Sequence, residues 1–228
     1  MSETPETAPL VLSQLPLFPL QTVLFPGGWM PLRIFEVRYL DMISRCHKAG
    51  APFGVVCLSE GSEVRRIDPN APPSGGTFAR EVFHPVGTLA RIEQLERPQP
   101  GLLVIHCRGL QRFHVTASHQ LPHGLWVGDV QLDDAEPVIP VPEHLAPTRD
   151  ALQRLLHNLQ EREPEDMNEL PLQPPYQWDD SGWVANRWAE LLPAPAELKQ
   201  RLMTLDNPLL RLELVSDLLD KLGLDGGN

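Results

Sequence analysis

The chain has 228 residues and a mass of 25.5 kDa, enough for one large domain or two small ones with a buried core. Acidic residues outnumber lysine and arginine by 30 to 19, and the net charge of −11 argues against nucleic acid as a partner, because phosphate backbones are bound mainly by surplus basic residues. The N-terminus lacks the features of a signal peptide, and no apolar run approaches the roughly 20 residues that span a bilayer, so we expect a cytoplasmic protein without membrane contact.

Strand-forming segments dominate the first half of the chain. Most are short, apolar or alternating, and bounded by glycine or proline, which is typical of strands that end in turns. The segments are Met30–Phe35, Pro52–Leu58, Val86–Leu95, Leu102–Gly109, Arg112–Ala117 and Leu125–Leu132. Turn residues in Arg97–Gly101 separate the third segment from the fourth, so we expect these two to form a hairpin.

One helix interrupts these strands. The segment VRYLDMISRCHKAG predicts a helix with an apolar stripe formed by Val37, Leu40, Ile43 and His47. Gly50 follows the stripe, and glycine there is typical of a left-handed helix C-cap.

The hydrophobic period changes after Leu132. A proline-rich linker, Asp133–His144, precedes segments with helical spacing of leucine and tryptophan, which predict a bundle of about four helices. Trp183 and Trp188 lie in an amphipathic segment of this region. We therefore divide the chain into a strand-rich domain at residues 12–134 and an α-helical domain at residues 143–223.

Motifs that carry common enzymatic chemistry are missing from the sequence. There is no GxxxxGK(S/T) phosphate loop, GxSxG nucleophile elbow, HExxH motif or GxGxxG motif. Four histidines lie close together in sequence: His106, His114, His119 and His123. No carboxylate lies near them at a spacing typical of metal ligands. We favour ordinary strand-face histidines over a metal site, and expect neither catalysis nor a cofactor.

Two further sets of residues have a chemical and a structural interpretation. Cys46, Cys57 and Cys107 have no CxxC spacing, and we expect small core residues rather than nucleophiles or ligands. Glu36 and Arg38 are a candidate acid–base pair. Because the chain enters a helix there, we favour a structural ion pair of Glu36 with one of the arginines Arg38, Arg33 or Arg112.

Several phrases occur in a characteristic order along the chain. LPLFPLQTVLFPGGWMPLRIFEVRYLDMI opens it, FGVV, VGTLARI and GLQRFHV follow, and ELLPAPAELKQRLMTLDNPLLRLELV lies near the C-terminus. Together they resemble the Lon N-terminal, or Lon substrate-binding, domain in its stand-alone bacterial form, over roughly residues 13 to 222. The resemblance implies an α+β fold, a PUA-like six-stranded pseudo-barrel followed by a C-terminal helical bundle.

The resemblance also implies a function. In the full-length protease an ATPase module and a Ser-Lys peptidase domain follow this region, and this sequence contains neither, so we do not transfer ATP hydrolysis or proteolysis to it. We expect a non-catalytic module for polypeptides, whose partners are unfolded or degron-bearing segments, or a protease or chaperone. The alternatives are an RNA-binding PUA-like protein, and a small-molecule enzyme that uses the histidines or the Glu36–Arg38 pair. The oligomeric state stays open.

The barrel implied by the resemblance gives the opening segment a structural role. Gly27 and Gly28 permit a sharp turn with positive φ, and Phe35 and Tyr39 are expected to pack onto the barrel as the helix begins.

Tryptophans are the candidate peptide anchors. We expect the polypeptide groove between the barrel and the helices. Trp29 in the PGGW loop is the leading candidate for an exposed anchor. Trp183 and Trp188 are further candidates, for which core packing is the favoured interpretation.

Overall fold

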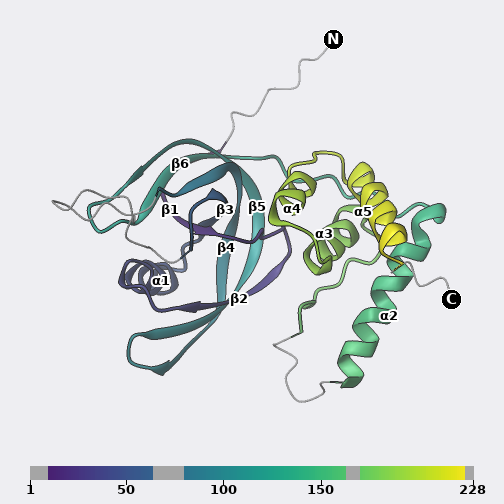
Figure 1. Cartoon of the computed structure of the whole chain (residues 1–228), viewed down its shortest axis with the longest axis horizontal. Helices are drawn as coiled ribbons and strands as arrows, with labels where there is room; N and C mark the ends of the chain where they lie inside the picture. Colours follow the sequence, from purple (N-terminus) through teal and green to yellow (C-terminus); the bar gives the residue numbers. More distant parts are fainter. Residues whose placement is uncertain (1–9, 64–79, 163–169, 224–228) are drawn as a thin grey trace, which may run out of the picture.

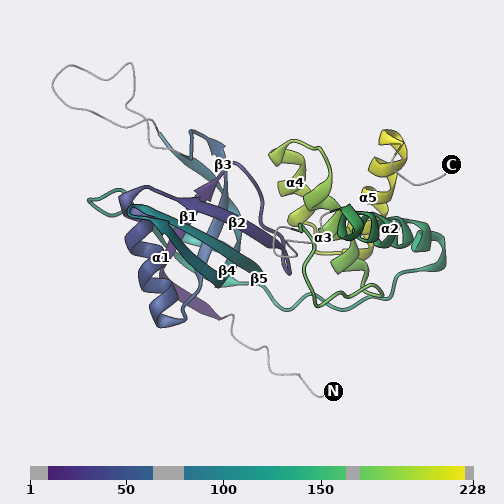
Figure 2. The ribbon, with the colours of Figure 1, turned by 90° about the horizontal axis from the view of Figure 1, so that it is seen from below.

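The structure is a computed structural model that describes residues 10–63, 80–162 and 170–223. It has two parts side by side, a sheet that curls into a barrel and a group of helices (Figure 1). Helix α1 (Val37–Ala49) lies on the side of the barrel away from the other helices, as the view in Figure 2 also shows.

Six strands form one sheet. They are β1 (Val11–Leu20), β2 (Trp29–Ile34), β3 (Phe53–Glu60), β4 (Val82–Gln99), β5 (Leu102–Gln120) and β6 (Trp126–Leu132). Their order is β2-β5-β4-β3-β1-β6, with an additional pairing of β5 with β6. The pair β1–β3 is parallel and the other pairs are antiparallel.

Strand β5 closes the sheet on itself. One edge of β5 pairs with β4. On the other edge, Leu103–Arg108 pairs with β2, and Phe113–Gln120 pairs with β6. Because β6 also pairs with β1, five strands form a ring and β2 remains outside it as an edge strand. The predicted α+β fold with a six-stranded pseudo-barrel is confirmed, and so is the hairpin, whose strands are longer than predicted.

The interior of the ring is narrow and filled by a few side chains. The buried Phe113 occupies its centre, with Leu17 and Val130 in the same cluster. Gly54 on β3 and Gly87 on β4 leave room for the ring of Phe113, because a Cβ at these positions would lie 2.8 Å and 2.6 Å from its Cζ. Close packing around Phe113 therefore forms part of the barrel core.

Helix α1 covers one opening of the barrel. It ends at Gly50, whose φ of 62° is the predicted left-handed C-cap. The predicted apolar stripe is correct only in part: Ile43 is buried and Leu40 packs against the core, but the other side chains that face the barrel belong to Tyr39, Met42 and Cys46. Tyr39 stacks on Phe18 with 4.1 Å between ring centroids. This stacking rotates Val37 and His47 into solvent, although the apolar pattern alone allowed either face.

Four α-helices and a short 3-10 turn form the second part. The elements are η1 (Glu143–Leu145), α2 (Ala146–Arg162), α3 (Ser181–Leu191), α4 (Ala196–Met203) and α5 (Pro208–Leu222). Asn207 caps α5 by accepting hydrogen bonds from the backbone N–H groups of Leu209 and Leu210. The predicted helix around Trp183 is present as α3, but the expected exposed face is missing, because α3 is buried from Ser181 to Ala189.

The barrel and the helices share one hydrophobic core. Val23, Phe25 and Cys57 from the barrel belong to the same cluster as buried side chains of α2 to α5. Hydrogen bonds cross the junction as well, from Arg112 Nη1 to the carbonyl of Met203 at 2.9 Å and from Gln200 Nε2 to the carbonyl of Val86 at 2.9 Å. The two parts are therefore in direct contact, and the expected groove between them stays a prediction. The domain bounds of 12–134 and 143–223 stay a prediction.

The Gly27–Gly28 turn lies at this junction. Gly27 has a φ of 74°, as the turn prediction required, and its N–H donates to the carbonyl of Gly109 at 2.8 Å. Gly28 is needed for a different reason, since a Cβ there would lie 2.0 Å from Glu190 Oε1 and 2.8 Å from the carbonyl oxygen of Phe25. The turn is thereby seated directly against α3, immediately before β2 begins.

We predict that Gly28→Ala lowers the free energy of unfolding by about 2 kcal/mol or more, because the new methyl group has no space beside a backbone carbonyl. Chemical denaturation measures this loss. The matched control is Gly101→Ala, since nothing lies within 4 Å of a Cβ there and only its φ of 79° is strained. The control is expected to lose about 1 kcal/mol. Equal losses in the two variants would contradict the close approach of the turn to α3.

Candidate functional site

Strand β2 presents an open edge. It pairs with β5 in a register that runs from Trp29 opposite Arg108 to Ile34 opposite Leu103. Within the described residues β5 is its one strand partner, so the second row of backbone N–H and C=O groups of β2 faces away from the sheet. Pro31 fits this position, because proline in a sheet is confined to edges, strand starts and bulges. The edge is a template for main-chain pairing with another chain.

A cavity of about 150 Å³ runs along this edge. Six consecutive residues line it, from Pro31 to Glu36. Alternate residues of a strand point to opposite faces of the sheet, so a cavity bordered by consecutive residues lies beside the edge of the strand. Phe18 and Leu20 of β1 and Tyr39 of α1 contribute to the other walls. The edge of β2 is therefore bordered by a largely apolar hollow.

Two apolar side chains stand in solvent at the end of β2. Phe35 is 56% exposed and Val37 is 74% exposed. The prediction that Phe35 packs onto the barrel is wrong, whereas Tyr39 does so. Strand alternation explains the difference, because Ile34 is buried on the inner face and Phe35 follows it on the outer face.

An ion-pair network holds the start of α1 beside this edge. Arg38 donates from Nε to Glu36 at 3.2 Å, from Nη2 to Glu81 at 3.1 Å and from Nη1 to the carbonyl of Gly124 at 2.8 Å. The pair of Glu36 with Arg38 is thus present, and Arg112 instead pairs with Asp133. Because the guanidinium of Arg38 is buried and fully engaged, the arrangement favours a structural role over acid–base chemistry.

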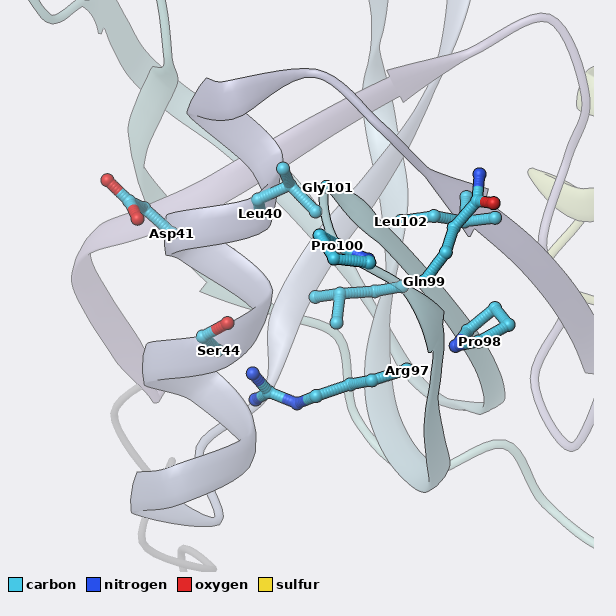
Figure 3. Close-up of a pocket in the computed structure, with 10 residues that line it drawn as sticks. Leu40, Asp41, Ser44, Arg97, Pro98, Gln99, Pro100, Gly101 and Leu102 are labelled. Atoms are coloured by element: carbon cyan, nitrogen blue, oxygen red, sulfur yellow. The ribbon is translucent and has the colours of Figure 1, made fainter.

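A larger hollow of about 450 Å³ lies on another side of α1. It is bordered by Leu40, Asp41 and Ser44 of the helix and by the tip of the β4–β5 hairpin, residues 97–103 (Figure 3). The side chain of Arg97 extends toward the helix across this hollow. Residues of α1 line both hollows, and α1 lies on the side of the barrel away from α2 to α5 (Figure 1).

The three candidate tryptophans have different surroundings. Trp29, the first residue of β2, is half-buried and stacks on His106 with 5.4 Å between ring centroids, and the guanidinium of Arg108 lies 5.2 Å from its ring. Trp183 and Trp188 are buried in the shared core. The indole N–H of Trp188 donates to the carbonyl of Thr148 at 2.9 Å. The packing interpretation fits these two, and Trp29 alone of the three borders the open edge.

The histidines and cysteines do not converge on a site. His106 stacks on Trp29, and His114 lies 2.9 Å from Asp133. The described part of the chain contains no group of three or more side chains placed to hold a metal ion. Burial raises the pKa of Cys57 to about 11 and that of Cys107 to about 12, so both thiols stay protonated and are poor nucleophiles at neutral pH.

A buried ion pair behind the Gly27–Gly28 turn was missed in the sequence. Arg187 lies 3.1 Å from Glu190 and donates to the carbonyl of Pro26 at 2.8 Å. Lys199 donates to the backbone carbonyl of Glu190 at 2.8 Å. The pKa of Glu190 is raised to about 7, because the effect of burial, which raises it, exceeds that of the positive charge of Arg187, which lowers it. An arginine followed three residues later by a glutamate is also common on exposed helix surfaces, so the sequence did not indicate that this ion pair is buried.

Residues 14–221 match the family described as the ATP-dependent protease La (LON) substrate-binding domain. The chain belongs to this family. The crystal structure of the Lon N-terminal domain protein from Xanthomonas campestris is similar, with a TM-score of 0.67 and 30% sequence identity over 90% of this chain and 98% of that chain. The N-terminal domain of Mycobacterium avium complex Lon protease has a TM-score of 0.51 at 20% identity over 90% and 96% of the two chains, and it shows a shared fold. No curated protein matches this chain.

The resemblance seen in the sequence is thus confirmed, and it locates the molecule among substrate-recognition folds. The Lon substrate-binding domain is itself non-catalytic. Among the described residues, none of the helices combines the length and apolar composition that crossing a membrane requires.

The raised pKa of Glu190 predicts a pH dependence of stability. The folded protein holds this proton more tightly than the unfolded chain, whose glutamate has the ordinary pKa of 4.5, so the contribution of Glu190 to stability falls as the pH rises from 4.5 to about 7. Glu190→Gln removes this titration. We expect the stability of the variant relative to the unmodified protein to rise across this range in denaturation measured at several pH values.

The control for this experiment is Glu96→Gln, an exposed residue of β4. Its stability relative to the unmodified protein is expected to show no comparable rise with pH. If the difference in unfolding free energy between Glu190→Gln and the unmodified protein were constant with pH, the raised pKa of Glu190 would be contradicted.

Proposed function

We propose that this protein is a non-catalytic module that binds extended segments of other polypeptides along the open edge of β2. The observation that carries the proposal is the cavity lined by the consecutive residues 31–36, beside an unpaired strand edge. Membership of the Lon substrate-binding domain family supports a polypeptide ligand.

The edge suits recognition by strand addition. In that mode main-chain hydrogen bonds supply affinity, and pockets for alternate side chains supply specificity. The six residues of β2 span about 20 Å, which is enough for a bound segment of similar length. Trp29 lies at one end of the edge, and Phe35 and Val37 lie at the other, so an added strand would contact an aromatic or apolar side chain at each end.

The partners we propose are unfolded or degron-bearing polypeptides, or a protease or chaperone that presents such a segment. We also propose a cytoplasmic location, since Cys46, Cys57 and Cys107 are buried and unpaired, as expected of a reducing compartment. We favour the edge over the groove between barrel and helices, because a shared hydrophobic core joins the two parts there.

The double variant Phe35→Ser, Val37→Ser tests the edge. Fluorescence anisotropy of a labelled, reduced and alkylated client measures binding, and thermal denaturation measures stability. We expect binding about tenfold weaker, because the apolar contact is lost, and a melting temperature close to that of the unmodified protein, because both residues are exposed.

The matched control is the double variant Leu210→Ser, Val138→Ser, which replaces exposed apolar residues away from β2. It is expected to bind the client as the unmodified protein does. Unchanged binding by the Phe35, Val37 variant, or equal losses in the two variants, would refute the edge as the binding site.

We expect the purified chain to lack ATPase and peptidase activity, because the sequence has neither a phosphate loop nor a nucleophile motif. Phosphate release and cleavage of a casein-like unfolded substrate measure these activities. Activity that copurifies with the chain through successive columns, and disappears with a variant of the chain, would overturn the non-catalytic assignment.

A further inference from the structure

We propose that the segment bound at the edge of β2 alternates apolar and acidic side chains, with its carboxylates on the face where Arg33 lies. This inference rests on the proposed function and specifies the chemistry of the ligand. It follows from the two faces of β2 and from the charges around them.

The two faces of β2 differ in character. Met30, Leu32 and Ile34 lie on the face that packs against the barrel core. Pro31 and Arg33 lie on the opposite face and are exposed. A strand that pairs with β2 continues the same alternation, so its side chains also divide between the two faces.

The inner face favours apolar side chains in the ligand. The cavity beside the edge has Phe18 and Leu20 on its wall, together with Leu32 and Ile34 of β2 itself. A ligand side chain on this face is removed from water by apolar atoms, and burial of a charged group there would be costly. Every second residue of the segment is therefore apolar.

The outer face carries an unpaired positive charge. Arg33 lines the cavity, and no carboxylate pairs with it within the described residues. Its neighbour on β5 is Val104, and neither β2 nor β5 contains an acidic residue. The nearest carboxylate along the register of the sheet is Glu96 on β4, two strands and about 10 Å away.

The acidic residues that line the cavity, Glu36 and Glu63, form no ion pair with Arg33. Glu36 pairs with Arg38 at 3.2 Å, and Glu63 accepts the backbone N–H of Gln21. In a chain with a net charge of −11, Arg33 is thus an exposed cation without an ion-pair partner among the described residues. A cross-strand carboxylate opposite Arg33 would complete an ion pair of the kind that stabilises neighbouring strands.

The test uses three short labelled peptides in which valine alternates with aspartate, serine or lysine. Fluorescence anisotropy gives their dissociation constants for the unmodified protein, Arg33→Glu and Arg45→Glu. Arg45 is exposed on α1 and outside both hollows, so Arg45→Glu changes the net charge equally without altering the edge. We expect the unmodified protein to bind the aspartate peptide about fivefold more tightly than the lysine peptide. Arg33→Glu should reverse this order, and Arg45→Glu should keep it.

The outcomes separate this inference from the proposed function. Equal binding of all three peptides, or an unchanged preference in Arg33→Glu, overturns the acidic preference and leaves the edge as the site. Binding that persists undiminished in the Phe35→Ser, Val37→Ser variant refutes the edge itself. Displacement of the aspartate peptide by a short RNA at physiological salt would show that Arg33 recognises phosphate, and would overturn the proposal of a peptide ligand.

Discussion

The pairing of β5 with three neighbours is the constraint on which the rest of the structure depends. A strand has two edges, and β4 occupies one of them. The other edge is divided between β2 and β6, so the segment that closes the ring cannot also pair with β2. Closure of the barrel through β6 therefore leaves β2 without a second strand partner in the part of the chain that the structure describes. The open edge is a direct consequence of how the barrel closes.

The remaining elements cover the barrel without covering this edge. The α2 to α5 helices bury Phe25 and Val23 at one side, and α1 covers the core around Phe18 at the other. Arg38 fixes the first turn of α1 by reaching Glu81 and the carbonyl of Gly124. That anchoring holds Tyr39 inward and leaves Val37 in solvent. Apolar exposure at the end of β2 is thus part of a well-ordered arrangement and not a loose terminus of a helix.

Buried charge connects the helices to the start of the same strand. Glu190 and Arg187 stand behind the Gly27–Gly28 turn, and Trp29 follows that turn directly. The position of the first residue of the edge therefore depends on packing between the two parts of the molecule. For a recognition module this rigidity is useful, because a preformed edge loses little conformational entropy when it orders a flexible ligand.

The sequence by itself determined the family and most of the elements, but its strand segments did not include β1 and divided β5 in two. Glycine and proline at turns, alternation in the strands and leucine spacing after Leu132 depend on local chemistry, which a short window of residues contains. The cap at Gly50 and the turn at Gly27 were found for the same reason. Trp29, which we expected to be exposed in a loop, is half-buried at the start of β2 and stacks on His106, and its role in binding is a proposal.

Tertiary structure decided which faces these elements show. Phe35 and Val37 are exposed, whereas Tyr39 is buried by stacking on Phe18. Phe18 lies 21 residues before Tyr39 in the chain, so the hydrophobic period of the helix could not predict this contact. The segment around Trp183 and Trp188 was predicted to have one exposed face. Its full burial depends on helices that come from distant parts of the chain, which a local pattern does not contain. The edge of β2 was hidden for the same physical reason, since whether a strand has one partner or two is decided by long-range pairing and not by its own residues.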